Sequence, residues 1–205
     1  MARTDLENEK ALNKIRVKID PDADEREAFR QLVDRMGDSD KPVYATNNKP
    51  WQSRVAVFKI ANIAVNENVP MKMFIGNPEC EFYDVDNFFS LLEQVDKSAG
   101  ATIVLAEKPT GSILAKWMAI DNLDNIEVHY KPKYDDSMHH VCVAGRAYRI
   151  ESPHKKSPPL SQVDDMFPQR PARFGFGREA DLKGINYYWE EQVFTDCFPL
   201  RPIAN

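Results

Sequence analysis

The sequence contains no run of apolar residues close to the about 18 that a membrane-spanning helix needs. The first twenty residues mix both charges and lack the apolar core of about 7–15 residues typical of a secretory signal peptide. Cysteine is also scarce, because Cys80, Cys142 and Cys197 are the whole set and lie far apart. Three widely spaced cysteines do not indicate a disulfide framework. These absences favour a cytoplasmic protein with reduced thiols and no membrane span.

Several motifs with known chemistry are missing as well. There is no Gly-x-Ser-x-Gly turn for an acyl-transfer serine, no internal repeat and no low-complexity tract. The glycine-interrupted stretch 173–177 matches neither a phosphate loop nor a dinucleotide fingerprint. His139, Cys142 and His154 are poor zinc ligands, because residues three apart in a strand point to opposite faces. We therefore expect no metal and no cofactor.

The composition is that of a folded domain with a polar surface. The chain has 205 residues, 42% of them hydrophobic, and a net charge of −5. This length predicts one domain, and the mild acidity argues against a protein whose whole surface coats nucleic acid. We predict a helical N-terminal extension at 1–40, an α/β domain at 41–197 and an irregular tail at 198–205.

Hydrophobic periodicity predicts alternating strands and helices through the middle of the chain. Strands are expected at 42–45, 71–75, 101–106 and 126–130. Helices are expected from Asp22, over 51–65, over 88–100 and around 113–120. Strands separated by helices imply crossover connections, and therefore a mostly parallel sheet with flanking helices.

The pattern changes after residue 138. Segments 139–143 and 146–150 read as the two strands of a β-hairpin around Ala144-Gly145. The stretch 152–171 holds five prolines and no periodicity, which predicts a long loop, and 182–193 predicts a closing helix.

Histidine and positive charge gather around this hairpin. All four histidines lie in one 26-residue window, at positions 129, 139, 140 and 154. Residues 129–156 carry six Lys and Arg against three Asp and Glu, a local net charge of +3, whereas the rest of the chain has −8. The contrast indicates an anion-facing patch. The alternative is a solvated hairpin with incidental charges.

Side-chain alternation assigns the hairpin residues to faces. Val141 and Val143 share one side with His139, while His140 and Cys142 share the other. If the valines face the core, His140 can act as a nucleophile or general base towards phosphorus, with Arg or Lys side chains holding the anion. The alternative is that His139 is a core histidine with its hydrogen bonds satisfied, and His140 a polar strand residue.

The order of elements from 71 to 195, with the hairpin His-His-Val-Cys-Val-Ala-Gly-Arg-Ala-Tyr-Arg-Ile-Glu, resembles a single phospholipase D-like module. The resemblance implies an α/β fold in which two modules face each other, a histidine attacks phosphorus and a lysine binds the phosphate oxygens. It places the attacking group at His140 or His139. The sequence has Val141 and Cys142 where a lysine would follow, and Ala144 where the superfamily often has Asp.

The first functional hypothesis is a metal-independent phosphodiesterase or nuclease-like enzyme. In it His140 attacks, and His139 or His154 donates the proton. Three residues bind the phosphate: Arg149, Lys131 and Arg146. A single module of this kind is expected to form a symmetric homodimer that pairs two histidines.

Two alternatives stay open. A catalytically silent module would keep the fold and bind a phosphodiester ligand, nucleic acid or a protein partner, which the missing lysine and aspartate favour. A structural or regulatory protein would instead use its acidic N-terminal 40 residues as a docking element.

Overall fold

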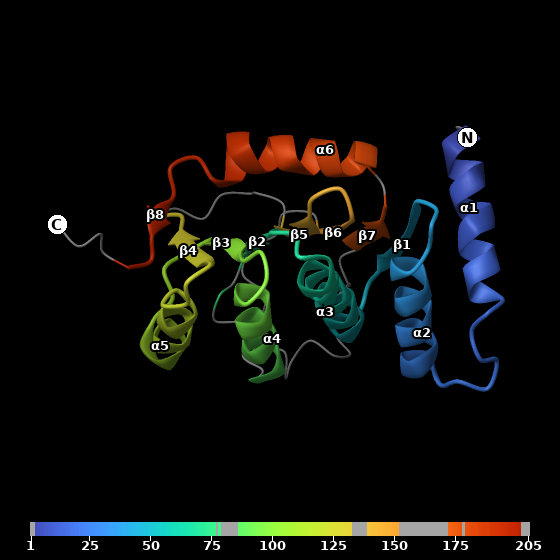
Figure 1. The fold of residues 1–205 in the computed structure, drawn as a ribbon, viewed down its shortest axis with the longest axis horizontal. Helices are drawn as coiled ribbons and strands as arrows, with labels where there is room; N and C mark the ends of the chain where they lie inside the picture. The colour runs from blue at the N-terminus through green and yellow to red at the C-terminus, as the bar shows by residue number, and fades with distance from the viewer. Residues whose placement is uncertain are drawn as a thin grey trace.

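The protein, seen here in a computed structural model, is described for residues 3–76, 78, 86–132, 139–151, 172–177 and 179–201. The strands of the described residues form one eight-stranded sheet, with helices on both of its faces (Figure 1). The strands are β1 (Val43–Asn47), β2 (Met71–Ile75), β3 (Ala101–Leu105), β4 (Ile126–Tyr130), β5 (His139–Val143), β6 (Ala147–Glu151), β7 (Ala172–Phe176) and β8 (Phe198–Pro199). Their order across the sheet is β1-β7-β6-β5-β2-β3-β4-β8.

The helices include each one that periodicity predicted. They are α1 (Arg3–Arg16), α2 (Glu25–Gly37), α3 (Pro50–Glu67), α4 (Asp86–Asp96), α5 (Gly111–Ile120), α6 (Glu179–Tyr188) and a π-helical turn, η2 (Trp189–Val193). The start of α2 differs from the prediction, since Asp24 rather than Asp22 is its N-cap and accepts a hydrogen bond from the Glu27 N–H. None of the helices in the described ranges combines the length and the hydropathy needed to cross a bilayer.

The sheet is mixed, so the prediction of a mostly parallel sheet is wrong. Among the strands that the structure describes, only the pairs β2–β3 and β3–β4 are parallel. The pairs β1–β7, β7–β6, β6–β5, β5–β2 and β4–β8 are all antiparallel. Helical crossovers α4 and α5 determine the direction of β2, β3 and β4. The hairpin then continues on the other side of β2, and each strand added there runs opposite to its neighbour.

Two strands were not predicted from the sequence. The glycine-interrupted stretch forms β7, and Gly175 is needed there because a Cβ at this position would lie 2.7 Å from the Tyr148 ring. The expected irregular tail begins instead with β8, which pairs with the end of β4 and is followed by buried Leu200. β7 has five residues and pairs with β1 and β6, whereas β8 has two residues and pairs with β4.

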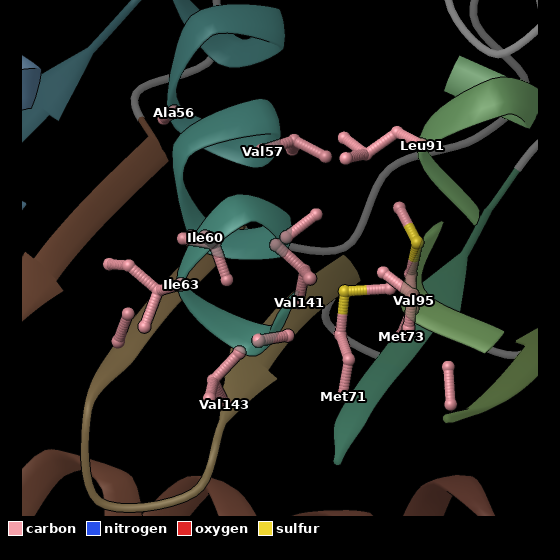
Figure 2. Packing of buried hydrophobic residues seen from close by; sticks show 14 of the residues in the cluster. Ala56, Val57, Ile60, Ile63, Met71, Met73, Leu91, Val95, Val141 and Val143 are labelled. Carbon is pink, nitrogen blue, oxygen red and sulfur yellow. The ribbon is translucent and has the colours of Figure 1, made fainter. Parts of the chain in front are cut away.

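The main core lies between the sheet and the helices α2 to α5. Figure 2 shows Ile60 of α3 beside Val141 of β5, and Val57 of α3 facing Leu91 of α4, in one cluster with Met73 of β2 and Val95 of α4. The valines of the hairpin therefore face the core, as predicted. Helix α2 contributes Phe29, Val33 and Met36 to the same cluster. Residues predicted as a helical N-terminal extension thus share the core of the α/β domain.

Helix α6 and the turn η2 cover the opposite face of the sheet (Figure 1). Phe74 and Val104 of the sheet pack there against Trp189 and Val193. A second small cluster joins Cys142, Tyr148 and Ile185. This layer encloses the side of the hairpin that carries His140.

Candidate functional site

The carboxyl ends of β2, β3 and β4 meet at one edge of the sheet. From β2 the chain crosses to β3 and β4 on one side, and it then returns to place β5 on the other side of β2. In open α/β sheets, ligands bind in the crevice outside the strand ends at such a switch in strand order. Because β5 runs antiparallel to β2, its first residues, His139 and His140, lie at this edge.

His140 lies under α6 and η2, on the face that alternation predicted. Its side chain is enclosed by three aromatic rings, and the residue is only 3% exposed. The ring centroid lies 5.3 Å from that of Trp189, 5.9 Å from Tyr188 and 6.2 Å from Phe74. Such close packing fixes the orientation of the imidazole and limits its access to a ligand.

His139 lies directly against the end of β2. A Cβ on Gly76 would be 1.7 Å from its Nε2 and 1.9 Å from its Cε1, so the imidazole occupies the space that a side chain at 76 would fill. Its ring also contacts Phe74, at 5.8 Å between centroids. His139 and His140 therefore share one aromatic neighbour, although alternation assigned His139 to the face of the valines. His139 is the first residue of its strand, where its ring reaches the Gly76 backbone.

The other described histidine is not part of this pair. His129 lies on β4, three strand positions from β5, which is about 14 Å across the sheet. Its ring packs at 5.0 Å against Phe194, and its Nε2 is 3.5 Å from a carboxylate oxygen of Glu127. His154, with the loop 152–171, lies outside the described residues. The structure thus brings together His139 and His140 from the histidine-rich window.

The three cations predicted to bind phosphate are separated. Lys131 follows β4, and its ammonium donates a 2.8 Å hydrogen bond to the carbonyl of Gln192 in η2. Arg149 of β6 pairs in register with Val141 and Phe174, so its side chain points to the α3 face, opposite His140.

Arg146 lies in the hairpin turn, at the other end of β5 from the histidines. It forms a two-pronged ion pair with Glu67 of α3, and hydrogen bonding to this carboxylate raises the pKa of Arg146. A surface groove near it is lined by Asp38, Lys41 and Gly145. This groove is at the edge of the sheet that the histidines do not reach.

Arg149 belongs to a buried polar cluster. Its Nη2 donates to the Ser53 hydroxyl at 2.8 Å and to the Glu151 carboxylate at 2.7 Å. Asn47, the last residue of β1, also donates to Ser53, at 2.7 Å. Sequence reasoning missed Asn47 and Ser53. The signal available in the sequence was position: Asn47 follows a predicted strand, and Ser53 lies in the first turn of the helix predicted after it.

Cys142 sits between the hairpin and α6. Burial raises the pKa of its thiol to about 12, while nearby Lys72 acts in the opposite direction. A thiol in this state stays protonated and behaves as a small apolar group. Among the described residues, no three His, Cys, Asp or Glu side chains converge as metal ligands would.

The sequence matches no protein-family model and no curated protein sequence. Its fold is similar to the crystal structure of Nuc from Salmonella typhimurium, a phospholipase D family member. The TM-score is 0.59 at 12% identity, and the alignment covers 79% of this chain and 100% of Nuc. NucT from Helicobacter pylori gives a TM-score of 0.54 at 8% identity, covering 78% of this chain and 99% of NucT. These similarities confirm a phospholipase D-like α/β fold.

Proposed function

We propose that this protein is a phospholipase D-like module, nuclease-like in function, that acts on a phosphodiester at the edge where β2 and β5 meet. The observation that carries the proposal is the pair of adjacent histidines at the switch in strand order. The phospholipase D-like fold supports it, because the resemblance implies histidine chemistry at phosphorus. No metal ion takes part in the proposed reaction.

Within the pair, His139 is the better candidate for attack. His140 is enclosed by Phe74, Tyr188 and Trp189. His139 is the first residue of β5, and its ring lies beside Gly76 at the end of β2. Both residues are buried, His139 at 9% exposed and His140 at 3%, so the preference for His139 rests on its place at the strand end and not on an open imidazole. His140 would then be a positioning residue, through the aromatic packing that it shares with His139.

The proposed reaction has two balanced steps. First, the unprotonated imidazole nitrogen of His139 forms a bond to phosphorus while the bond from phosphorus to the leaving oxygen breaks. A general acid protonates that oxygen, and His154 keeps this role as a prediction. Water then attacks phosphorus and the P–N bond breaks. The proton of that water passes to the residue that acted as general acid in the first step and now acts as general base.

A second copy of the chain is expected to take part. One module supplies one such edge, and a symmetric dimer would bring two histidine pairs to a shared ligand. We propose this homodimer, with the cytoplasm as its compartment. Light scattering at several protein concentrations tests the dimer directly, and a monomer at every concentration would contradict it.

The test of activity is hydrolysis of bis(p-nitrophenyl) phosphate in the presence of a chelator. We expect turnover by the wild type, loss of it in His139→Ala and retention in the matched control His129→Ala. His140→Phe fills the same aromatic enclosure and should reduce turnover less than His139→Ala. Circular dichroism verifies that each variant is folded. Equal turnover by wild type and folded His139→Ala would remove His139 as the nucleophile.

A catalytically silent module is the second candidate, and a specific observation favours it. The three described cations of the predicted patch already have protein partners: Lys131 the Gln192 carbonyl, Arg149 the carboxylate of Glu151, and Arg146 that of Glu67. Phosphorus chemistry without a cation at the phosphoryl oxygens loses its main charge stabilisation. Salt-dependent binding of an oligonucleotide without any hydrolysis would support this candidate over the enzyme.

A further inference from the structure

Arg149 has hydrogen-bonding capacity that its described neighbours do not use. The residue is 6% exposed and carries a permanent charge. Only its Nη2 has partners, Ser53 and Glu151, and its buried Nε–H has no acceptor within the described part of the chain. A buried donor on a charged group without an acceptor is unfavourable, and such sites commonly bind a further polar group.

Asn47 shows the same feature beside it. The residue is 3% exposed, its amide nitrogen donates to the Ser53 hydroxyl at 2.7 Å, and its amide oxygen has no described partner. Rotation of the amide by 180° would let the Ser53 hydroxyl donate to the oxygen. The amide nitrogen would then become a second unused donor next to Arg149.

These groups lie at the start of an 18-residue helix. Helix α3 begins with Pro50, and its N-cap residue Lys49 offers no side-chain acceptor to the N–H groups of the first turn. The Gln52 side chain accepts instead from the backbone N–H groups of Asn48 and Lys49, and the Ser53 N–H donates to the Lys49 carbonyl. The N–H groups of Trp51 and Gln52 are therefore the ones that remain for a ligand. The positive end of the helix dipole favours an anion at this position. Ser53 lies in the first turn and is the group that Arg149 contacts, so the guanidinium is held against the helix start.

The cluster lies at the same edge of the sheet as the proposed attacking histidine. Register places Asn47, Ala172, Glu151 and His139 in one row across the ends of β1, β7, β6 and β5. Glu151 is the direct cross-strand neighbour of His139, a separation of about 5 Å between Cα atoms. A ligand that reaches His139 therefore passes close to this cluster.

We propose that Arg149, Asn47 and the first turn of α3 form a second phosphate subsite, which binds the phosphate next to the one at His139. This inference rests on the proposed function and deepens it: the substrate class is a strand with at least two linked phosphates, as in a nucleic acid backbone. Arg149 pairs in register with Val141, two residues along β5 from His139, so we assign it to the neighbouring phosphate and not to the phosphoryl group under attack.

Glu151 sets the affinity of the subsite. Its carboxylate neutralises part of the Arg149 charge and repels an incoming phosphate. Removal of that charge should strengthen phosphate binding. A purely structural ion pair predicts the opposite pattern, in which Glu151→Gln lowers stability and leaves phosphate binding unchanged.

Calorimetric titration of inorganic phosphate into the full-length protein tests the subsite without any need for turnover. We expect Arg149→Lys and Asn47→Asp to weaken phosphate binding by about tenfold or more, the equivalent of one hydrogen bond to a charged group. Glu151→Gln should bind phosphate more tightly than the wild type. Arg146→Lys, in an arginine–glutamate pair at the opposite edge, is the matched control and should bind as the wild type does.

A second titration tests the substrate class. A trinucleotide with two internal phosphates should bind more tightly than a dinucleotide with one, and Arg149→Lys should remove that difference. Asn47→Asp is isosteric and carries the test if Arg149→Lys does not fold. Phosphate binding that is absent in the wild type, or unchanged in both variants, would overturn the subsite.

Hydrolysis is measured separately, so the two proposals can fail independently. If turnover depends on His139 but phosphate binding does not depend on Arg149, the subsite alone is overturned. Phosphate binding that depends on Arg149, in a protein without turnover, supports the subsite and overturns only the enzyme.

Discussion

Gly76 allows the position of His139 to be tested by a single methyl group. Gly76 is buried, and its backbone is not in the left-handed region that only glycine favours. An alanine at 76 therefore meets no backbone penalty. Its Cβ would instead lie 1.7, 1.9 and 2.7 Å from three atoms of the His139 imidazole. To reach ordinary contact at 3.4 Å, the ring must move by at least 1.7 Å.

The size of the effect follows from this overlap. Overpacking of a well-packed site costs about 1–3 kcal/mol, so Gly76→Ala should lower the free energy of unfolding by that amount. In the double variant with His139→Ala the overlap disappears. The two substitutions should then be non-additive by about 1–2 kcal/mol, with the double variant more stable than the sum of the single effects predicts.

Urea unfolding of the four proteins measures this coupling. Gly184→Ala is the control, because Gly184 is exposed on α6 with nothing within 4 Å of an added Cβ. It should stabilise the protein by about 0.5–1 kcal/mol through helix propensity. A Gly76→Ala variant as stable as the wild type, with no coupling to His139→Ala, would show that the imidazole does not lie against Gly76. Displacement of His139 should also reduce the hydrolysis that we propose for this residue.

Four further outcomes are expected. Native Cys142 should not be alkylated by iodoacetamide at pH 8, because burial raises the pKa of its thiol to about 12. Peptide mass spectrometry measures the alkylation, and modification of Cys142 before unfolding would contradict this burial. The thiol ionises near 9.0 in the unfolded chain, so the higher pKa in the folded protein lowers the free energy of unfolding only as the pH rises from 9 to about 12. Cys142→Ala should remove this pH dependence of stability. Lys131→Met should cost about 1–2 kcal/mol in urea unfolding, since the Gln192 carbonyl loses its ammonium donor; an unchanged midpoint would refute this. Asn8→Ala should cost about 1 kcal/mol, because the Asn8 side chain accepts from the Tyr44 N–H at the outer edge of the sheet, and equal stability would show that water replaces it.

Local patterns were sufficient for much of the secondary structure. The strands at 71–75, 126–130 and 139–143 begin and end at the predicted residues. Each is a short apolar or alternating run, and such a pattern is contained within five residues. Strands β7 and β8 were missed because they contain glycine or proline, and because their pairing partners are distant in sequence.

The sequence by itself determined that two adjacent histidines begin a hairpin strand, and that His140 and Val141 point to opposite faces. Only the tertiary structure decided what surrounds them. Strand order places β5 beside β2, which brings Gly76 against His139 and leaves Arg146 at the far edge of the sheet. Contacts of this kind join residues tens of positions apart. They depend on which strands pair, and no local periodicity encodes that choice.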